Sequence, residues 1–215
     1  MFDQFIPATY KNVTREQFIL RARQAAQAVG IRYEWLMCVI MVESMFKPNA
    51  YNASSGASGL IQWVGSTAKS LHGLTTAQIR EMDGLQQLGL IVELFKKQGH
   101  AGKMHSLDDV IMSVHYPAYM GQSRSKVLYS EGSEAYRLNK TFDTDTLKGG
   151  NNDGAVTLGE VVDRYRYFIR VRLGDANYAQ ITSVELDSTR SILVYLGVLA
   201  GLAGGYYLLK KYGNG

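Results

Sequence analysis

The chain has 215 residues, of which 46% are hydrophobic and 20% are charged, and these proportions argue against a disordered chain. The net charge of +4 suits an anionic partner such as a cell-wall polymer, a membrane surface or nucleic acid. It does not choose among them, because the basic residues are scattered. The single cysteine, Cys38, excludes an intrachain disulfide, and its apolar neighbours predict a packed thiol.

Helix signals recur from the N-terminus to about residue 173. We expect helices at residues 14–29, 33–45, from near 62, from 75, 83–98, 106–115 and 157–173. Four of them open with a capping box, in which the first side chain accepts a hydrogen bond from the third helical residue. The boxes are Thr14-x-x-Gln17, Thr75-x-x-Gln78, Ser106-x-x-Asp109 and Thr157-x-x-Glu160. Residues 121–154 are polar and turn-rich, and only residues 155–158 indicate a short strand pairing, so the predicted fold class is mainly α.

An isolated carboxylate, Glu43, ends the apolar helix of residues 33–45. Apolar surroundings disfavour the charged form of a carboxyl and raise its pKa. A glutamate that is protonated near neutral pH is what a general acid requires to protonate a glycosidic oxygen. A surface glutamate at a helix end is the alternative interpretation.

A loop of very small residues follows this acid, with the sequence NASSGASG at residues 52–59. A polymer strand approaches a backbone closely only where side chains are small, so this loop predicts one wall of a groove. A phosphate-binding loop is the other interpretation of such glycines. It fails here because no Lys-Ser or Lys-Thr pair follows and no strand precedes.

The stretch ESMFKPNAYNASSGASGLIQW, at residues 43–63, resembles the two signature motifs of the lytic transglycosylase family, which is similar to goose-type lysozyme. The family pattern is Glu-Ser, a short spacer, an Asn, and then Gly-x-x-Gly-Leu-x-Gln. The matching positions are Glu43, Ser44, Asn52, Gly56, Gly59, Leu60 and Gln62. The family's third motif places a Tyr after an apolar helix, and SVHYPAYMG resembles it at Tyr116, with Tyr119 as the alternative.

The resemblance implies a lysozyme-like helical domain that cleaves the MurNAc–GlcNAc bond of peptidoglycan. It implies that Glu43 works alone as acid and then base, while the sugar's own hydroxymethyl oxygen attacks and leaves a 1,6-anhydro end. The substrate-binding residues that we expect are Ser44, Asn52, Ser58, Gly59, Gln62, Tyr116 and Tyr119. Gln86 and Gln87 are further candidates for the groove.

Hydrolysis of the same bond is the close alternative. It requires a second carboxylate at roughly 5–9.5 Å from the first. No Asp or Glu follows Glu43 until Glu81, but Asp83, Glu93 or Asp108 remain candidates through folding.

The sequence GGNNDGAVTLGE, at residues 149–160, nearly fits a calcium loop. It also resembles the Asp-Gly-x-Ile/Val-Thr-x-x-Glu element of phage-type relatives of the family. We expect no cofactor, and calcium is the alternative. Its candidate ligands are Asp145, Asn151, Asp153 and Glu160. A turn followed by a helix cap explains the same residues without a metal. The four histidines show no zinc-ligand spacing.

Residues 192–209 carry no charged side chain, and about 17–25 such residues cross a bilayer as a helix. Tyr206 and Tyr207 near one end, with Lys210 and Lys211 beyond, are typical of a membrane interface. The four-residue spacing of Gly197, Gly201 and Gly205 predicts a face for helix self-association.

These features together predict a lysozyme-like helical domain at residues 1–173, a polar linker at 174–190 and a single transmembrane helix at 191–211. The N-terminus lacks the pattern of a secretory signal. We therefore expect a membrane-anchored enzyme that acts in the periplasm, carried by a phage virion to deliver its genome, with peptidoglycan and membrane but no nucleic acid as partners. The alternatives are a bacterial membrane-anchored wall-remodelling enzyme, a non-catalytic peptidoglycan-binding module and a membrane-fusion protein.

Overall fold

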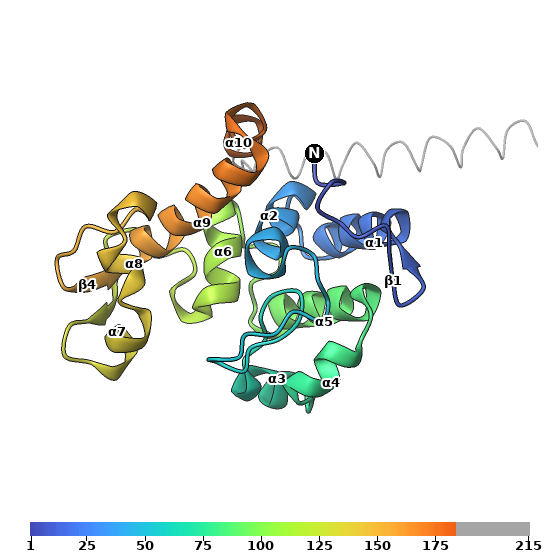
Figure 1. Cartoon of the computed structure of the whole chain (residues 1–215), viewed down its shortest axis with the longest axis horizontal. Coiled ribbons are helices and arrows are strands. Elements are labelled where there is room, and N and C mark those ends of the chain that lie inside the picture. Colours follow the sequence, from blue (N-terminus) through green and yellow to red (C-terminus); the bar gives the residue numbers. More distant parts are fainter. Residues whose placement is uncertain (184–215) are drawn as a thin grey trace, which may run out of the picture.

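The computed structural model describes residues 1–183 and is mainly helical within them (Figure 1). The helices are α1 (Arg15–Ala28), α2 (Tyr33–Ser44), α3 (Gly65–His72), α4 (Thr76–Glu81), α5 (Gly84–Lys97), α6 (Leu107–His115), α7 (Glu134–Asn139), α8 (Thr141–Thr144), α9 (Leu158–Leu173) and α10 (Asp175–Thr182), with 3₁₀ turns η1 (Pro117–Tyr119) and η2 (Thr146–Lys148). The strands are β1 (Thr9–Tyr10), β2 (Val13–Thr14), β3 (Val127–Ser130) and β4 (Ala155–Thr157). The predicted fold class is confirmed for the helical domain.

All four predicted capping boxes are present, and a fifth joins Asp83 to Gln86 at the start of α5. Each box satisfies two backbone N–H groups that a helix leaves without partners at its first turn. The helix expected from near residue 62 begins later, at Gly65, because Trp63 still pairs with Ser58 in an isolated β-bridge.

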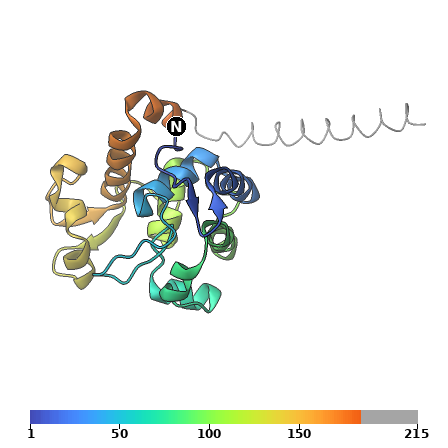
Figure 2. The same cartoon turned by 45° about the vertical axis from the view of Figure 1, so that its right-hand side comes forward.

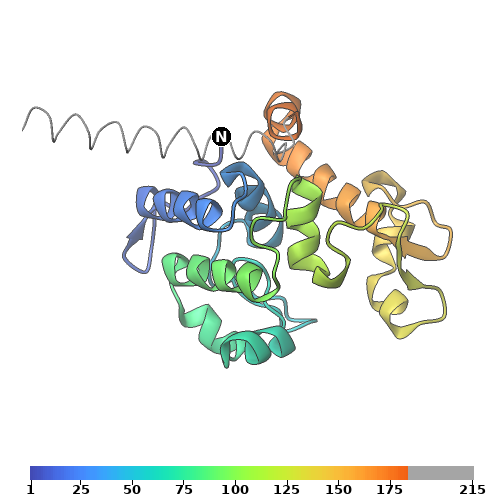
Figure 3. The same ribbon diagram turned by 180° about the vertical axis from the view of Figure 1, so that it is seen from behind.

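Helix α2 lies at the centre of the core and contacts α1, α6 and α9. Its residues 35–41 are all buried, and each large apolar side chain buried there contributes about 1.5–3 kcal/mol. Cys38 is confirmed as a packed thiol, since it is fully buried and burial raises its pKa. From behind, α1 and α5 run side by side and complete this half of the core (Figure 3).

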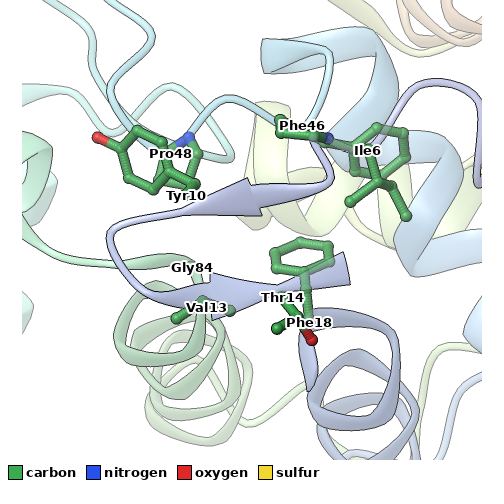
Figure 4. Close-up of a pocket in the computed structure, with 9 residues that line it drawn as sticks. Ile6, Tyr10, Val13, Thr14, Phe18, Phe46, Pro48 and Gly84 are labelled. Atoms are coloured by element: carbon green, nitrogen blue, oxygen red, sulfur yellow. The ribbon is translucent and has the colours of Figure 1, made fainter. Parts of the chain in front are cut away.

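The strands β1 and β2 form a hairpin over α1, with Lys11 and Asn12 in the left-handed conformation that a tight two-residue turn requires. A small apolar pocket of about 20 Å³ lies beneath the hairpin (Figure 4). Phe18 packs edge-on against Phe46 there and covers Gly84. A Cβ at Gly84 would lie 2.7 Å from the Phe18 ring, so glycine at this position allows α5 to approach α1.

Residues 121–157 form a small lobe on the far side of α6 and α9 (Figures 1 and 2). The sequence predicted turns there, and the structure adds strand β3 and helices α7 and α8. Strand β3 pairs antiparallel with β4, which is the strand pairing expected near residues 155–158. Long-range pairing of β3 is invisible to local sequence patterns.

Residues 175–182 differ from the expected linker, because they form α10 and pack against the domain. Ile181 is fully buried, and its carbonyl accepts hydrogen bonds from Trp35 Nε1 (3.3 Å) and Arg32 Nη1 (3.0 Å). The folded body therefore extends past Leu173.

Within residues 1–183, no single helix is long and apolar enough to cross a membrane. The pair α1 and α2 passes that test of length and composition only when joined across a bend of 117°. The predicted transmembrane helix at 191–211, including Gly197, Gly201 and Gly205, lies outside the described residues.

Candidate active site

A cavity of about 480 Å³ lies between the loop of residues 52–64 and the lobe of residues 121–157. In two views the tip of the loop points toward the lobe (Figures 1 and 2). The lining of the cavity comes from both of these walls and from α2, α3, α5, α6, η1 and α9. The lining residues are Glu43, Asn52, Ser55, Ala57, Ile61, Gln62, Trp63, Val64, Thr67, Leu94, Gln98, Val114, His115, Pro117, Tyr129, Asn139, Phe142 and Tyr165.

Glu43 reaches this cavity from the last turn of α2, which ends one residue later, at Ser44. Met45 and Phe46 both adopt positive φ, at 52° and 59°, which is uncommon for residues other than glycine. Burial of the Phe46 ring, which is 1% exposed, offsets the cost of that turn. Ser44, in contrast, is buried and donates to the Ile40 carbonyl (3.1 Å), so its hydroxyl faces the helix and not the cavity.

The surroundings of Glu43 favour its protonated form. Burial raises the pKa of Glu43 to about 7, although a hydrogen bond from Tyr165 opposes the rise. The Tyr165 hydroxyl donates to Glu43 Oε1. Burial, with the adjacent carboxyl, raises the pKa of Tyr165 in turn, so Tyr165 remains a hydrogen-bond donor at neutral pH.

No second carboxylate of residues 1–183 lines the cavity. The three candidates from the sequence are engaged elsewhere. Asp83 caps α5, Glu93 pairs with His72 and Lys97, and Asp108 pairs with Arg124 and Arg166. This arrangement favours chemistry with one carboxyl group over two-carboxylate hydrolysis.

The loop beside Glu43 is fixed from behind by Gln87. Its Oε1 accepts from the Leu60 N–H (2.8 Å), and its Nε2 donates to the Pro48 and Ile79 carbonyls. Gly59 has a φ of 82°, and a Cβ there would lie 2.5 Å from Gln87 Oε1. Gln87 is fully buried, so it supports the loop and does not line the groove. Gln86 likewise accepts from the Asp83 N–H in a helix cap.

Of the residues that the resemblance assigned to the loop, Asn52 and Gln62 line the cavity. Asn52 Oδ1 also accepts from Ser54 N and Oγ, which holds the loop's turn. Ser58 and Gly59 do not line it. Ser58 is fully buried and donates to the Gly56 carbonyl (3.3 Å), so the structure gives it a role within the loop.

Tyr116 and Tyr119 lie next to the cavity but do not line it. Tyr116 stacks on Tyr129 at 5.8 Å between ring centroids, and Tyr129 does line it. Lys126 lies over the Tyr119 ring. The hydroxyl that contacts Glu43 comes instead from Tyr165 on α9, a residue that the sequence interpretation missed.

His115 is a second lining residue that was missed. Its ring lies edge-on to Phe142 and Tyr165, and its Nε2 is buried without a hydrogen-bond partner. Burial lowers the pKa of His115 to about 4, so the imidazole is neutral at physiological pH. The cavity is therefore lined by a neutral imidazole and by a carboxyl group whose pKa is raised.

In the candidate calcium loop, Asp143 and not the expected Asp145 lies with the other carboxylates. Asp143, Asp153 and Glu160 bring carboxylate oxygens within 4.8 Å of one another, whereas Asp145 pairs with Lys148 and Arg164. Asp143 is fully buried and accepts from the backbone of residues 153 and 154. Asn151 lies beside this group, with its backbone N–H donating to Glu160 Oε1 (3.2 Å). Calcium binding stays a prediction, with Asp143 in the place of Asp145.

Comparison with known families agrees with this geometry. Residues 21–86 match the family model of the transglycosylase SLT domain. No curated protein sequence matches the chain. The matched segment contains Glu43 and the whole loop wall of the cavity. The match shows that this part of the chain is similar to the transglycosylase SLT domain.

Proposed function

We propose that the chain cleaves the MurNAc–GlcNAc β-1,4 bond of peptidoglycan as a lytic transglycosylase, with Glu43 as its single acid and base. The observation that carries the proposal is the state of Glu43. It is a carboxyl group with a pKa of about 7, in a cavity lined by no other carboxylate of residues 1–183. A carboxyl with that pKa is protonated in a large fraction of molecules at neutral pH, as a general acid must be.

The first step uses the proton of Glu43. Because Oε1 accepts from Tyr165, we place the acidic proton on Oε2. Oε2 donates it to the bridging oxygen while the bond from C1 of MurNAc to that oxygen breaks. The departing GlcNAc end keeps the proton as a hydroxyl, and C1 gains positive character.

The second step regenerates the acid. The C6 hydroxyl oxygen of the same MurNAc bonds to C1, and its proton passes to the Glu43 carboxylate. The product is a 1,6-anhydro ring, and no water is consumed. Tyr165 stabilises the carboxylate between the two steps, because its hydrogen bond favours the charged form.

A comparison of Glu43→Gln with Glu93→Gln tests the catalytic part of the proposal. Glu93 is 55% exposed, lies outside the cavity and was a candidate second carboxylate, so it is the matched control. Loss of a general acid lowers the rate by about 10²–10⁴-fold, and we expect that loss for Glu43→Gln only. Release of soluble muropeptides from purified peptidoglycan measures the rate. Equal, measurable activity of wild type and Glu43→Gln would contradict the role of Glu43. No activity of the wild type would leave the non-catalytic binding module as the better account.

We further propose that the enzyme works from a membrane, through residues 191–211, and that a phage virion carries it to open the wall for its genome. The uncharged run at residues 192–209 supports the anchor. Leu199→Arg together with Leu202→Arg places two charges near the centre of the span, at about 2.5–3.5 kcal/mol each. We expect the full chain to float with liposomes and the double variant to stay in the dense fractions. Equal flotation would contradict the anchor.

Detection of the chain in purified virions distinguishes the phage enzyme from a bacterial wall-remodelling enzyme. The proposal predicts its presence there in a fixed ratio to the structural proteins. Presence only in the bacterial envelope would favour the alternative.

A further inference from the structure

A second groove of about 500 Å³ lies next to the start of the loop wall, at Tyr51, and Glu43 does not line it. It is lined by Tyr10, Lys11, Asn49, Tyr51, Arg80 and Glu81. None of these six residues lines the cavity that holds Glu43. Its lining is aromatic and charged, in contrast to the small apolar pocket beneath the N-terminal hairpin.

The two grooves share one stretch of backbone. Tyr51 lines the second groove, and its direct neighbour Asn52 lines the cavity with Glu43. Tyr51 pairs with Ser58, and Ser58 pairs with Trp63, which also lines the cavity. The backbone of residues 51–52 therefore borders both grooves.

Arg80 is held in this groove with its charge uncompensated. Its guanidinium lies over the Tyr51 ring at 4.3 Å from the centroid, and its Nη1 donates to Ser58 Oγ (3.4 Å). No carboxylate of residues 1–183 forms an ion pair with Arg80. The nearby Glu81 pairs with Lys11 (3.2 Å), so these two charges offset each other and leave the groove with the charge of Arg80.

This arrangement has the features of a carboxylate site. A guanidinium carries five N–H donors in a planar fork, and Ser58 uses one of them. Stacking on an aromatic ring fixes the plane of the fork before a ligand arrives, so less side-chain entropy is lost when it binds. Tyr51 is 56% exposed, which leaves the stacked pair open to a ligand.

We propose that Arg80, held by Tyr51, binds a carboxylate of the peptide stem attached to the glycan strand in the catalytic cavity. This inference rests on the proposed function. The stems of peptidoglycan carry free carboxylates and project from the MurNAc sugars. A stem of about five residues spans at most ~17 Å, which is enough to cross a wall one backbone thick.

The test compares two substrates that share the same glycan. One is intact peptidoglycan, and the other is glycan strands from which an amidase has removed the stems. We expect Arg80→Gln to raise KM for the intact substrate by about threefold to tenfold, which is the range for an accessible charge-assisted pair, and to leave cleavage of the stem-free strands unchanged. Unchanged cleavage of those strands also shows that the variant is folded.

Arg23→Gln is the matched control. Arg23 lies over the Tyr33 ring at 4.2 Å and lines neither groove, so this change removes a similarly placed guanidinium and the same charge outside both linings. We expect it to behave as wild type on both substrates. An equal effect of Arg80→Gln on the two substrates, no effect on either, or the same effect from Arg23→Gln would overturn the inference.

Failure of the proposed function has a different signature, since wild type would then cleave neither substrate. Co-sedimentation of the full chain with insoluble peptidoglycan, in the Glu43→Gln background, still tests the inference in that case. The expected result is weaker sedimentation when Arg80→Gln is added, and equal loss after the stem carboxylates of the peptidoglycan are converted to amides. Sedimentation that responds to neither change would refute the stem site.

Discussion

The raised pKa of Glu43 predicts a stability that depends on pH. Folding shifts the Glu43 pKa from an ordinary value of 4.5 to about 7. Because the folded value is the higher one, the contribution of Glu43 to stability is complete below pH 4.5 and is lost as the pH rises through 7. A shift of about 2.5 units corresponds to an upper value of about 3 kcal/mol at pH 8.

Glu43→Gln removes this titration. The free energy of unfolding of the variant, minus that of the wild type, should therefore increase by up to about 3 kcal/mol between pH 4.5 and pH 8. Urea unfolding at a series of pH values measures the difference. The difference is the quantity to follow, because a pH-independent offset from the lost Tyr165 contact cancels from its slope.

In the wild type, the pH dependence of stability that comes from His115 partly cancels the one that comes from Glu43. The pKa of His115 falls from 6.5 to about 4 on burial, so its contribution is present above pH 6.5 and is lost as the pH falls toward 4. The two slopes oppose each other between about pH 4.5 and 6.5. In Glu43→Gln the slope of His115 remains, and stability should rise with pH in that range. A stability difference between variant and wild type that is flat with pH would refute the assigned state of Glu43.

Two further predictions concern the support of the site. Tyr165→Phe removes a hydrogen bond that lowers the Glu43 pKa. The fall of kcat/KM at alkaline pH, expected near pH 7, should therefore move to higher pH. A pH profile of kcat/KM that stays the same would contradict the contact. Gly59→Ala should destabilise the fold by about 2–4 kcal/mol, because the added Cβ would lie 2.5 Å from Gln87 Oε1. Gly56 has a similar φ of 72° but open space around it, so Gly56→Ala should cost only about 1 kcal/mol. Thermal unfolding compares the two, and equal losses would exclude the Gln87 contact as the cause.

Local signals predicted the helical framework because capping boxes act within four residues. Thr14, Thr75, Ser106 and Thr157 each open a helix where the sequence placed one. The same locality explains what was missed. Strand β3 pairs with a strand more than 20 residues away, and α10 is held by a buried Ile181 whose partners lie in and beside α2.

The residues of the candidate site were likewise predicted where the signal is local and missed where the partner is distant in sequence. The motif of residues 43–62 predicted Glu43, Asn52 and Gln62 at one site, and the structure brings these three residues to one cavity. Tyr165 was missed, although it occupies the buried face of α9 between Val161 and Ile169, four residues away on either side. A buried tyrosine hydroxyl requires a partner, which was the available signal. The sequence did not reveal that the partner is 122 residues away.

The most direct test of the central claim is mass spectrometry of purified peptidoglycan digested with the full chain, beside Glu43→Gln. Reaction through one carboxyl group predicts products that end in 1,6-anhydroMurNAc and that disappear in the variant. Reducing MurNAc ends would instead show that water is the nucleophile, and would contradict the single-carboxyl mechanism drawn from the cavity.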